Sequence, residues 1–338
     1  MRFATTLDGQ PLLVAHDRQR ATPIDDLAPS LLAVLQQWPA LQPRLAARAA
    51  ALEAGATDPQ SFCSADCAAP LPQAPQWLDG SAFLHHGRLL ERAFGNPPIP
   101  DFDTVPLLYQ GASDDFLGPG MDVPLPSEDD GIDVEGEFGV VVDDVPMGVT
   151  PEEALGHVRL LVLINDWSLR RFGPREMKAG FGFIQAKPST AFAPLAVTPD
   201  ELGPAWHGGR VHLDLHVHCR GEHLGQPSGS AMDFHFGTLI AHAARTRRLR
   251  AGSIVGSGTV SNDDLAAGSA CLAERRVLEM LQTGAAHTPF LRFGDRVQLE
   301  ARHADGRPGP FGRIDQRVVG ASVPNQPRAF ASASRGSR

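Results

Sequence analysis

The stretch GIDVEGEFGVVVDD, residues 131–144, has the alternation of a β-strand, with acidic residues gathered on one side. One set of alternate positions is mainly apolar, and the other set begins with Asp133, Glu135 and Glu137. Successive side chains of a strand point to opposite faces, so Glu135 and Glu137 would share a face about 6.6 Å apart. At an effective dielectric constant of about 20, the two charges would repel by about 2.5 kcal/mol. The pattern leaves two interpretations: an acidic face in water, or carboxylates that hold a hard cation, which prefers oxygen ligands.

The composition describes an ordinary globular chain. Its 338 residues are 42% hydrophobic and 20% charged, which indicates one or two domains with a large core. The net charge of −9 disfavours nucleic acid and anionic membranes as partners. No run approaches the roughly 18 apolar residues of a membrane span, and residues 1–14 lack the apolar stretch of a signal peptide. We therefore expect a cytoplasmic protein.

Neither the cysteines nor the histidines show a convincing transition-metal pattern. Four cysteines do not make a disulfide framework, and Cys63 and Cys67 lack a second ligand pair at zinc spacing, so we interpret them as reduced. His212, His216 and His218 alternate with apolar residues. That spacing could hold a transition metal, but it favours the exposed face of a strand.

Local signals divide the chain into a small first part and a strand-rich second part. Residues 2–16 read as a hairpin around Asp8-Gly9, and residues 28–54 as a helix broken near Pro39. A linker over residues 63–75 suggests a small N-terminal domain over residues 1–70. A larger domain over residues 71–325 and a polar, disordered tail over residues 326–338 would follow. In the larger domain we expect strands and few helices, and therefore an α+β class, with the helices at 84–94, 151–157, 167–178 and 234–248.

Two segments offer partners for the acidic stretch. An apolar strand from Leu160 to Ile164 ends at Asn165-Asp166; Asp166 could bind a ligand at the strand end, or it could cap the next helix. Lys187 lies in the nearly uncharged segment FGFIQAKPSTAFAP, residues 181–194. A lysine in such a setting either reaches out to water or pairs with carboxylates, and a buried carboxylate cluster would need such a cation.

Two more segments complete the set. In SIVGSGTVSN, residues 253–262, small residues follow a short apolar strand; they allow close approach of a ligand, or simply form a tight turn. In QWLDGSAFLHHGRLL, residues 76–90, Asp79 precedes an expected helix that carries His85 and His86. Histidine is suited to proton transfer near neutral pH, although a lone histidine is more often structural.

Taken together, these segments resemble the fumarylacetoacetate hydrolase family over about residues 76–320. The motifs that carry the resemblance follow the family's order: E-x-E at Glu135 and Glu137, N-D-W-S-x-R at residues 165–170, the lysine Lys187, and G-S-G-T at residues 256–259. The resemblance implies a mixed β-roll with a small N-terminal domain, and a homodimer.

The resemblance also implies a metal site and a catalytic base. Glu135, Glu137 and Asp166 match the family's ligands for a divalent ion, Mg²⁺ or Ca²⁺ with Mn²⁺ as a further choice. Asp79 matches a fourth ligand, seven residues before the catalytic histidine His86.

The remaining matched positions concern the histidine and the substrate. Glu274 matches the glutamate that polarises the histidine. Tyr109, the only tyrosine, matches a substrate contact. Arg170, Lys187 and Thr259 match groups that hold substrate oxygens.

The chain departs from the family pattern in three places. Gly173 stands where the family has a glutamine, Thr190 comes one position early after Lys187, and residues 1–70 are shorter than in the animal enzymes. The first two departures affect substrate contacts and not the metal site.

The resemblance implies a metal-dependent hydrolase that cleaves the C–C bond of a 1,3-diketo acid such as fumarylacetoacetate, in the breakdown of tyrosine or other aromatic compounds. The alternative within the family is a metal-dependent decarboxylase, hydratase or isomerase of 2-keto acids. Asp79, His86 and Tyr109 favour hydrolysis. A non-catalytic Ca²⁺-stabilised protein is a third hypothesis, which Lys187 disfavours because a cation among the ligands would weaken a purely structural site.

Overall fold

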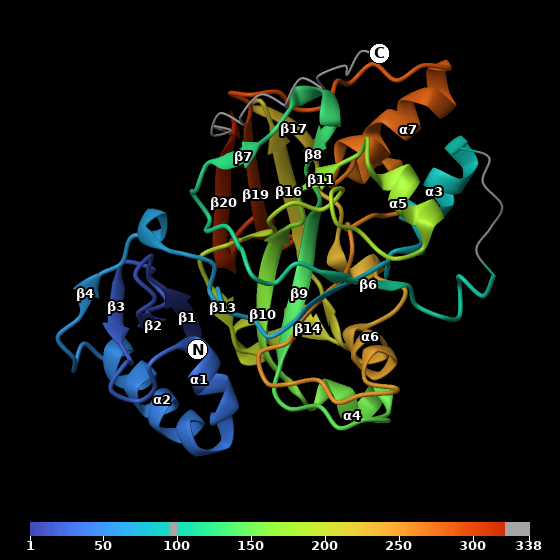
Figure 1. Ribbon diagram of the computed structural model, residues 1–338. Helices are drawn as coiled ribbons and strands as arrows, with labels where there is room; N and C mark the ends of the chain where they lie inside the picture. The colour runs from blue at the N-terminus through green and yellow to red at the C-terminus, as the bar shows by residue number, and fades with distance from the viewer. Residues whose placement is uncertain (95–99, 322–338) are drawn as a thin grey trace, which may run out of the picture.

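The computed structural model describes residues 1–94 and 100–321 and confirms a strand-rich α+β fold with an N-terminal domain. An eleven-stranded sheet runs through both parts of the chain (Figure 1). All of its neighbouring strands are antiparallel except β18 and β5. The order is β4 (Gln60–Ser61), β3 (Arg20–Pro23), β2 (Pro11–Val14), β1 (Arg2–Thr5), β13 (Ala196–Val197), β10 (Val158–Asn165), β9 (Gly136–Val142), β18 (Ile254–Gly256), β5 (Trp77–Gly80) and β6 (Leu108–Gly111), with β12 (Ala191–Phe192) paired to β10.

A second sheet and several short elements cover this framework. The five-stranded sheet has the order β17 (Glu222–Gly225), β16 (Asp214–Cys219), β19 (Arg296–Arg302), β20 (Pro308–Gly320) and β7 (Val123–Leu125). Two strand pairs stand apart: β8 (Ile132–Asp133) with β11 (Ser168–Leu169), and β14 (Trp206–His207) with β15 (Arg210–Val211).

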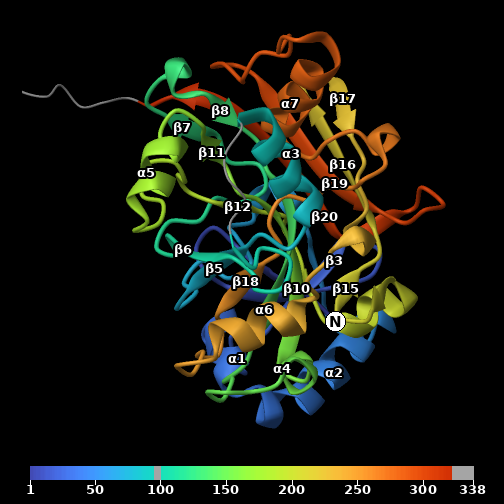
Figure 2. The same ribbon diagram turned by 90° about the vertical axis from the view of Figure 1, so that its right-hand side faces the viewer.

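The described helices lie around these sheets (Figures 1 and 2). The α-helices are α1 (Leu31–Gln36), α2 (Trp38–Glu53), α3 (Leu84–Phe94), α4 (Pro151–Leu155), α5 (Gly173–Ala179), α6 (Phe236–Ala243) and α7 (Leu272–Thr283). The 3₁₀ turns are η1 (Ser64–Asp66), η2 (Glu128–Asp130), η3 (Pro199–Ala205), η4 (Gly229–Ala231) and η5 (Leu265–Ala267). None of the helices described here is long and apolar enough to cross a membrane.

The apolar run at the end of the opening stretch is explained by burial on both faces of β9. Val140 and Val142 pack in the cluster that contains the inner side chains of β16, β19 and β20. Val141, on the opposite face, packs in a second cluster with side chains of α1 and α2. Glu137 is fully buried in the same strand. The interpretation of an acidic face in water is therefore wrong.

The predicted N-terminal hairpin and broken helix are confirmed. β1 and β2 form the expected antiparallel hairpin, with Gly9 at positive φ in the turn. The expected helix breaks at Gln37, between α1 and α2. Pairing of β1 with β13 joins this hairpin to the rest of the large sheet.

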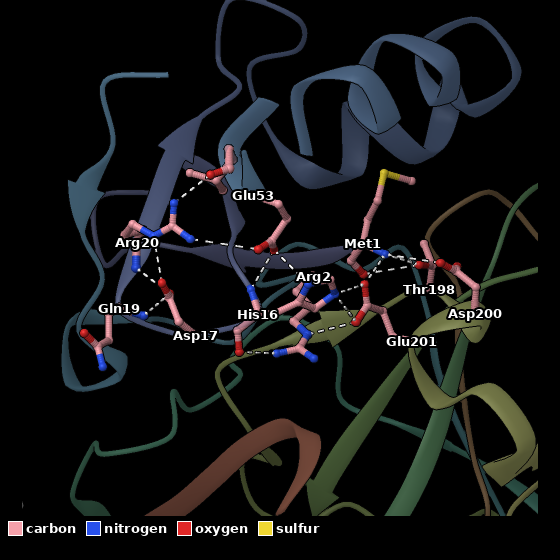
Figure 3. A network of polar contacts seen from close by, with 11 residues as sticks. Met1, Arg2, His16, Asp17, Gln19, Arg20, Glu53, Thr198, Asp200 and Glu201 are labelled. Carbon is pink, nitrogen blue, oxygen red and sulfur yellow. Dashed lines mark hydrogen bonds and ion pairs between the residues drawn. The ribbon is translucent and has the colours of Figure 1, made fainter. Parts of the chain in front are cut away.

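A polar network adds to that junction (Figure 3). Glu201, in η3, lies 3.0 Å from Arg2 Nε and 3.2 Å from His16 Nε2. The second nitrogen of His16 lies 3.0 Å from Glu53, at the end of α2. The network therefore holds the first strands and α2 against η3.

The helix predictions for the second part were right in three places and wrong in two. α3, α4 and α6 lie within their predicted ranges, and Thr150 forms the expected capping box of α4. The helix predicted over 167–178 begins only at Gly173, because Ser168 and Leu169 pair with β8. α7 was not predicted. The domain boundary at residue 70 and the homodimer stay predictions, and the predicted disordered tail lies outside the described residues.

Candidate active site

Three strands of the large sheet bring buried carboxylates to one place. Asp79 lies on β5, Glu137 on β9, and Asp166 directly follows β10. β10 pairs with β9 so that Ile164 is opposite Glu137, and β18 links β9 to β5. One carboxylate oxygen from each residue lies within 4.8 Å of the others, and all three side chains are buried. Segments far apart in the sequence thus form one acidic cluster.

The electrostatics of this cluster favour a cation among the carboxylates. Neither carboxylate oxygen of Glu137 has a hydrogen-bond partner among the described residues. Burial, together with the charges of Asp79 and Asp166, raises the pKa of Glu137 well above its usual value. Burial and the charge of Asp166 raise the pKa of Asp79 to about 7. Glu137 and Asp79 thus resist ionising beside Asp166, and an all-oxygen ligand set of this kind fits Mg²⁺, Ca²⁺ or Mn²⁺.

Glu135 lies beside the cluster and binds cationic side chains. β8 ends at Asp133 and β9 begins at Gly136, so Glu135 falls in the interruption between them. Its carboxylate lies 2.6 Å from Arg170 Nη1 and 2.5 Å from Lys187 Nζ. Burial raises the pKa of Glu135, but the charges of Arg170 and Lys187 outweigh burial and lower it to about 2. Lys187 and Arg170 thus offset its charge, and the unpaired carboxylate of the opening stretch is Glu137.

Asp166 accepts hydrogen bonds from three side chains. Lys187 Nζ and the Tyr109 hydroxyl donate to its Oδ2 at 2.7 and 2.5 Å, and Thr190 Oγ1 donates to its Oδ1 at 2.7 Å. Burial lowers the pKa of Lys187, but Asp166 and Glu135 raise it above its usual value, so the ammonium stays charged. The N-cap interpretation of Asp166 is wrong, because α5 begins after Phe172. Pairing of Lys187 with carboxylates is confirmed.

A histidine–glutamate pair joins two helices next to the carboxylates. α3 and α7 pack against each other (Figure 2), and His86 Nδ1 lies 2.7 Å from Glu274 Oε2. A carboxylate only accepts hydrogen bonds, so Nδ1 carries the proton and Nε2 is left as a base. Glu274 is 1% exposed and His86 18% exposed, so the imidazole remains accessible. His85 turns away and pairs with Asp263 at 2.6 Å.

The glycine-containing turn after β18 contacts Asp79 of the cluster. Gly258 N donates to Asp79 Oδ1 at 3.1 Å. A Cβ at Gly258 would lie 2.3 Å from the carbonyl oxygen of Gly80. The small residues therefore allow this turn to lie close to β5. Thr259 follows in the same turn and is buried; its substrate contact stays a prediction.

Sequence reasoning missed α7 and gave no role to Thr190 at Asp166. The signal for α7 was present in residues 271–284, where Glu274 stands three positions after Cys271 and Gly284 ends the helix. The Thr190 contact had no local signal, because it depends on how the segment after Lys187 returns to β10.

Comparison with known proteins gives family matches over both parts of the chain. The family model described as fumarylacetoacetate (FAA) hydrolase C-terminal matches residues 76–319, and that of fumarylacetoacetase N-terminal domain 2 matches residues 1–73. A 2,4-didehydro-3-deoxy-L-rhamnonate hydrolase of Sphingomonas sp. (strain SKA58) is 31% identical over 48% of this chain and 55% of its own length. An oxaloacetate tautomerase of Xenopus laevis is 26% identical over 48% of this chain and 49% of its own. The chain thus spans about half the length of these curated relatives.

A solved structure extends the likeness over nearly the whole chain. Maleylpyruvate hydrolase from Sphingobium sp. SYK-6, in complex with manganese(II) and pyruvate, superimposes with a TM-score of 0.64 at 16% identity. The superposition covers 95% of this chain and 100% of the other. At this identity the likeness shows the fold.

Proposed function

The chain belongs to the fumarylacetoacetate hydrolase family, and from that premise we propose that it hydrolyses a C–C bond of a 1,3-diketo acid such as fumarylacetoacetate. Enzymes of this family include hydrolases, isomerases and tautomerases. The observation that carries the choice of hydrolysis is the His86–Glu274 pair at 2.7 Å. The pair is connected to the carboxylates through Asp133, which binds the start of α7 and Arg170, and Arg170 contacts Glu135.

The acidic cluster is proposed to hold the divalent ion that enzymes of this family bind. Asp79, Glu137 and Asp166 would supply oxygen ligands, and Glu135 a further oxygen from the neighbouring segment. Once bound, the ion would act as a Lewis acid toward the substrate carbonyl and toward the enolate that C–C cleavage releases.

The side chains of the chain itself account for the proton transfers. Nε2 of His86 takes a proton from water, and the water oxygen bonds to the distal carbonyl carbon of the diketo acid. The bond from that carbon to the methylene carbon then breaks, and its electron pair leaves with the methylene carbon as an enolate. Protonated His86 returns its proton to that carbon. The products are a carboxylic acid and a keto acid.

The basic side chains next to the cluster suit the charges of the substrate. Arg170 and Lys187 remain ionised and partly accessible, with 24% and 10% of their side chains exposed. Fixed cations of this kind stabilise an oxyanion that develops during a reaction. We assign them, with Tyr109 and Thr259, to binding substrate oxygens.

Turnover of 1,3-diketo acids tests the proposal. Purified protein with Mg²⁺ or Mn²⁺ should consume one member of a panel, measured as loss of the enol absorbance. His86→Ala should lower kcat at least about 10²-fold, the usual contribution of general-base catalysis. It should bind the ion normally, because hard cations prefer oxygen ligands.

The control variant is His85→Ala, which changes the adjacent residue of the same helix and should leave kcat unchanged. Normal turnover by His86→Ala would reject the hydrolytic mechanism. If oxaloacetate-type 2-keto acids were decarboxylated or tautomerised while every diketo acid stayed intact, the alternative activity would replace it.

A further inference from the structure

Asp133 is the last residue of β8 and is buried. It connects the two parts of the active site, which are the His86–Glu274 pair and the carboxylate cluster. Its Oδ1 accepts a hydrogen bond from Leu272 N at 2.7 Å, and its Oδ2 accepts one from Ala273 N at 2.8 Å. Arg170 Nε donates to the same Oδ2 at 2.8 Å. Asp133 is 0% exposed, and the proposed reaction gives it no step. A fully buried carboxylate therefore binds a helix N-terminus and an active-site arginine at once.

The N-terminus of α7 depends on this carboxylate. Leu272, Ala273 and Glu274 are the first three residues of α7, and the N-cap is Cys271. The Cys271 thiol accepts from Glu274 N at 3.3 Å, and sulfur is a weak acceptor. Asp133 thus supplies the two strong acceptors of the first turn, where the helix dipole also favours a negative charge.

Glu274 follows directly on the two amides that Asp133 binds. Its carboxylate is the partner of His86 Nδ1, so the position of the first turn of α7 sets the orientation of the imidazole. A displacement of the first turn would carry Glu274 away from His86.

Arg170 extends the same connection to the carboxylate half. With Nε on Asp133, its Nη1 reaches Glu135 Oε1 at 2.6 Å. Glu135 in turn holds Lys187, which also binds Asp166. An unbroken series of contacts therefore runs from His86 through Asp133 to Asp166.

We propose that Asp133 is a positioning residue: it fixes Glu274 through the start of α7 and Arg170 through its guanidinium, and so aligns the base with the carboxylate cluster. The effect on rate rests on the proposed function, whereas the effect on the His86–Glu274 bond does not. The two are tested separately.

The first test is the hydrogen bond itself, observed by proton NMR of the resting protein. An imidazole N–H in a short bond to a carboxylate gives a downfield resonance, and loss of one such signal in Glu274→Gln assigns it to His86. Asp133→Asn, which turns one acceptor into a donor, should remove or shift that signal. The signal of His157, paired with Asp143 at 2.6 Å elsewhere, should stay as an internal reference.

The second test is kinetic. Asp133→Asn should lower kcat by about 10-fold to 10²-fold, the usual effect of a small misplacement of catalytic groups, and change KM less. Because part of the effect of Asp133 runs through Glu274, the losses in kcat from Asp133→Asn and Glu274→Gln should be less than additive in the double variant.

Two further variants keep the proposal falsifiable. Asp133→Glu retains the charge beside Arg170 but moves the carboxylate by one methylene group. It should also shift the His86 signal. If Asp133→Asn does not fold, Asp133→Glu tests the role of Asp133 in its place. Thr150→Ala removes the cap of α4 and should lower the melting temperature while the signal and kcat stay unchanged.

An unchanged His86 signal in a folded Asp133 variant would overturn the proposal, and so would strictly additive losses in the double variant. If the wild-type protein cleaved no diketo acid, the proposed function would fail, and the NMR result alone would still decide the role of Asp133.

Discussion

At the scale of single residues, the decisive feature is a buried carboxylate whose polar neighbours among the described residues are other carboxylates. Glu137 is completely buried, and the described residues offer neither of its oxygens a hydrogen bond. Glu135, two positions earlier in the same stretch, instead contacts Arg170 and Lys187. An isolated buried charge is costly, so Glu137 is either protonated or bound to a cation.

Replacing Glu137 tests the cation. Glu137→Gln should weaken binding of Mg²⁺ or Mn²⁺ at least about tenfold, because losing even a supporting group of a metal site costs that much. The protein has a single tyrosine, and its hydroxyl binds Asp166. Protein labelled with 3-fluorotyrosine should therefore give one ¹⁹F resonance that moves on metal addition.

A matched control uses a glutamate on the surface. Glu153→Gln, at an exposed position of α4, should bind metal as the wild type does. Equal affinities for Glu137→Gln and the wild type would place the ion elsewhere.

The raised pKa of Asp79 predicts how stability depends on pH without metal. The folded protein holds this proton up to about pH 7, whereas an unfolded aspartate loses it near pH 4. Between these values the folded state binds more protons, so the free energy of unfolding falls as pH rises. Metal binding must displace the proton of Asp79. Added Mn²⁺ should therefore raise the melting temperature more at pH 8 than at pH 5; equal increments at both would contradict the assignment.

At the scale of elements, the side chains of the site lie on strands and near helix ends. The turns between these elements set the distances between the side chains. β5 and β9 are both neighbours of β18, and the turn after β18 touches Asp79. α3 carries the base His86, and α7 carries its partner Glu274. The site is therefore sensitive to backbone positions that make no contact with substrate.

Gly258 gives a direct test of that sensitivity. Gly258→Ala should lower the melting temperature, because left-handed backbone costs about 1–2 kcal/mol for a residue with a Cβ, and the φ here is 77°. The added Cβ would also lie 2.3 Å from Gly80 O and push the turn away from Asp79. Metal affinity, measured by calorimetry, should therefore fall as well.

Gly148→Ala separates backbone strain from the clash. Gly148 has a φ of 78°, and nothing lies within 4 Å of an added Cβ. It should lower the melting temperature and leave metal binding unchanged. Equal metal affinity in both variants would mean that the turn does not position Asp79.

At the scale of the whole molecule, one sheet joins the N-terminal strands to the strands that carry the site. Only β1 and β13 connect the two groups of strands in the described sheet order. The network around Glu201 closes the same junction with charged side chains (Figure 3). Stability of the junction and activity of the site should therefore respond to different residues.

Glu201→Gln should loosen the N-terminal strands without affecting turnover. Losing a charged partner of Arg2 and His16 should cost about 2 kcal/mol, seen as a lower melting temperature and faster hydrogen exchange in β1–β3. Asp200→Asn is the control, because Asp200 is 78% exposed and should change neither. A large loss of kcat in Glu201→Gln would show that the junction reaches the active site.

Local sequence determined several elements of this protein, and motif order indicated its family. The hairpin at Asp8-Gly9, the break between α1 and α2, the strand ending at Asn165 and the cap of α4 follow from turn residues, proline and apolar spacing. These signals act over a few residues. Composition also drew attention to Lys187, but it left open whether this lysine reaches water or pairs with carboxylates.

Tertiary structure alone decided which charges meet. In the sequence, Glu135 and Glu137 are equivalent acids of one strand. In the fold, cations from two distant segments pair with Glu135, and Glu137 is left with Asp79 and Asp166. The link from Asp133 to α7 likewise spans 139 residues. Electrostatic energy depends on distance through space and on burial, and neither quantity is present in the spacing of residues along a chain.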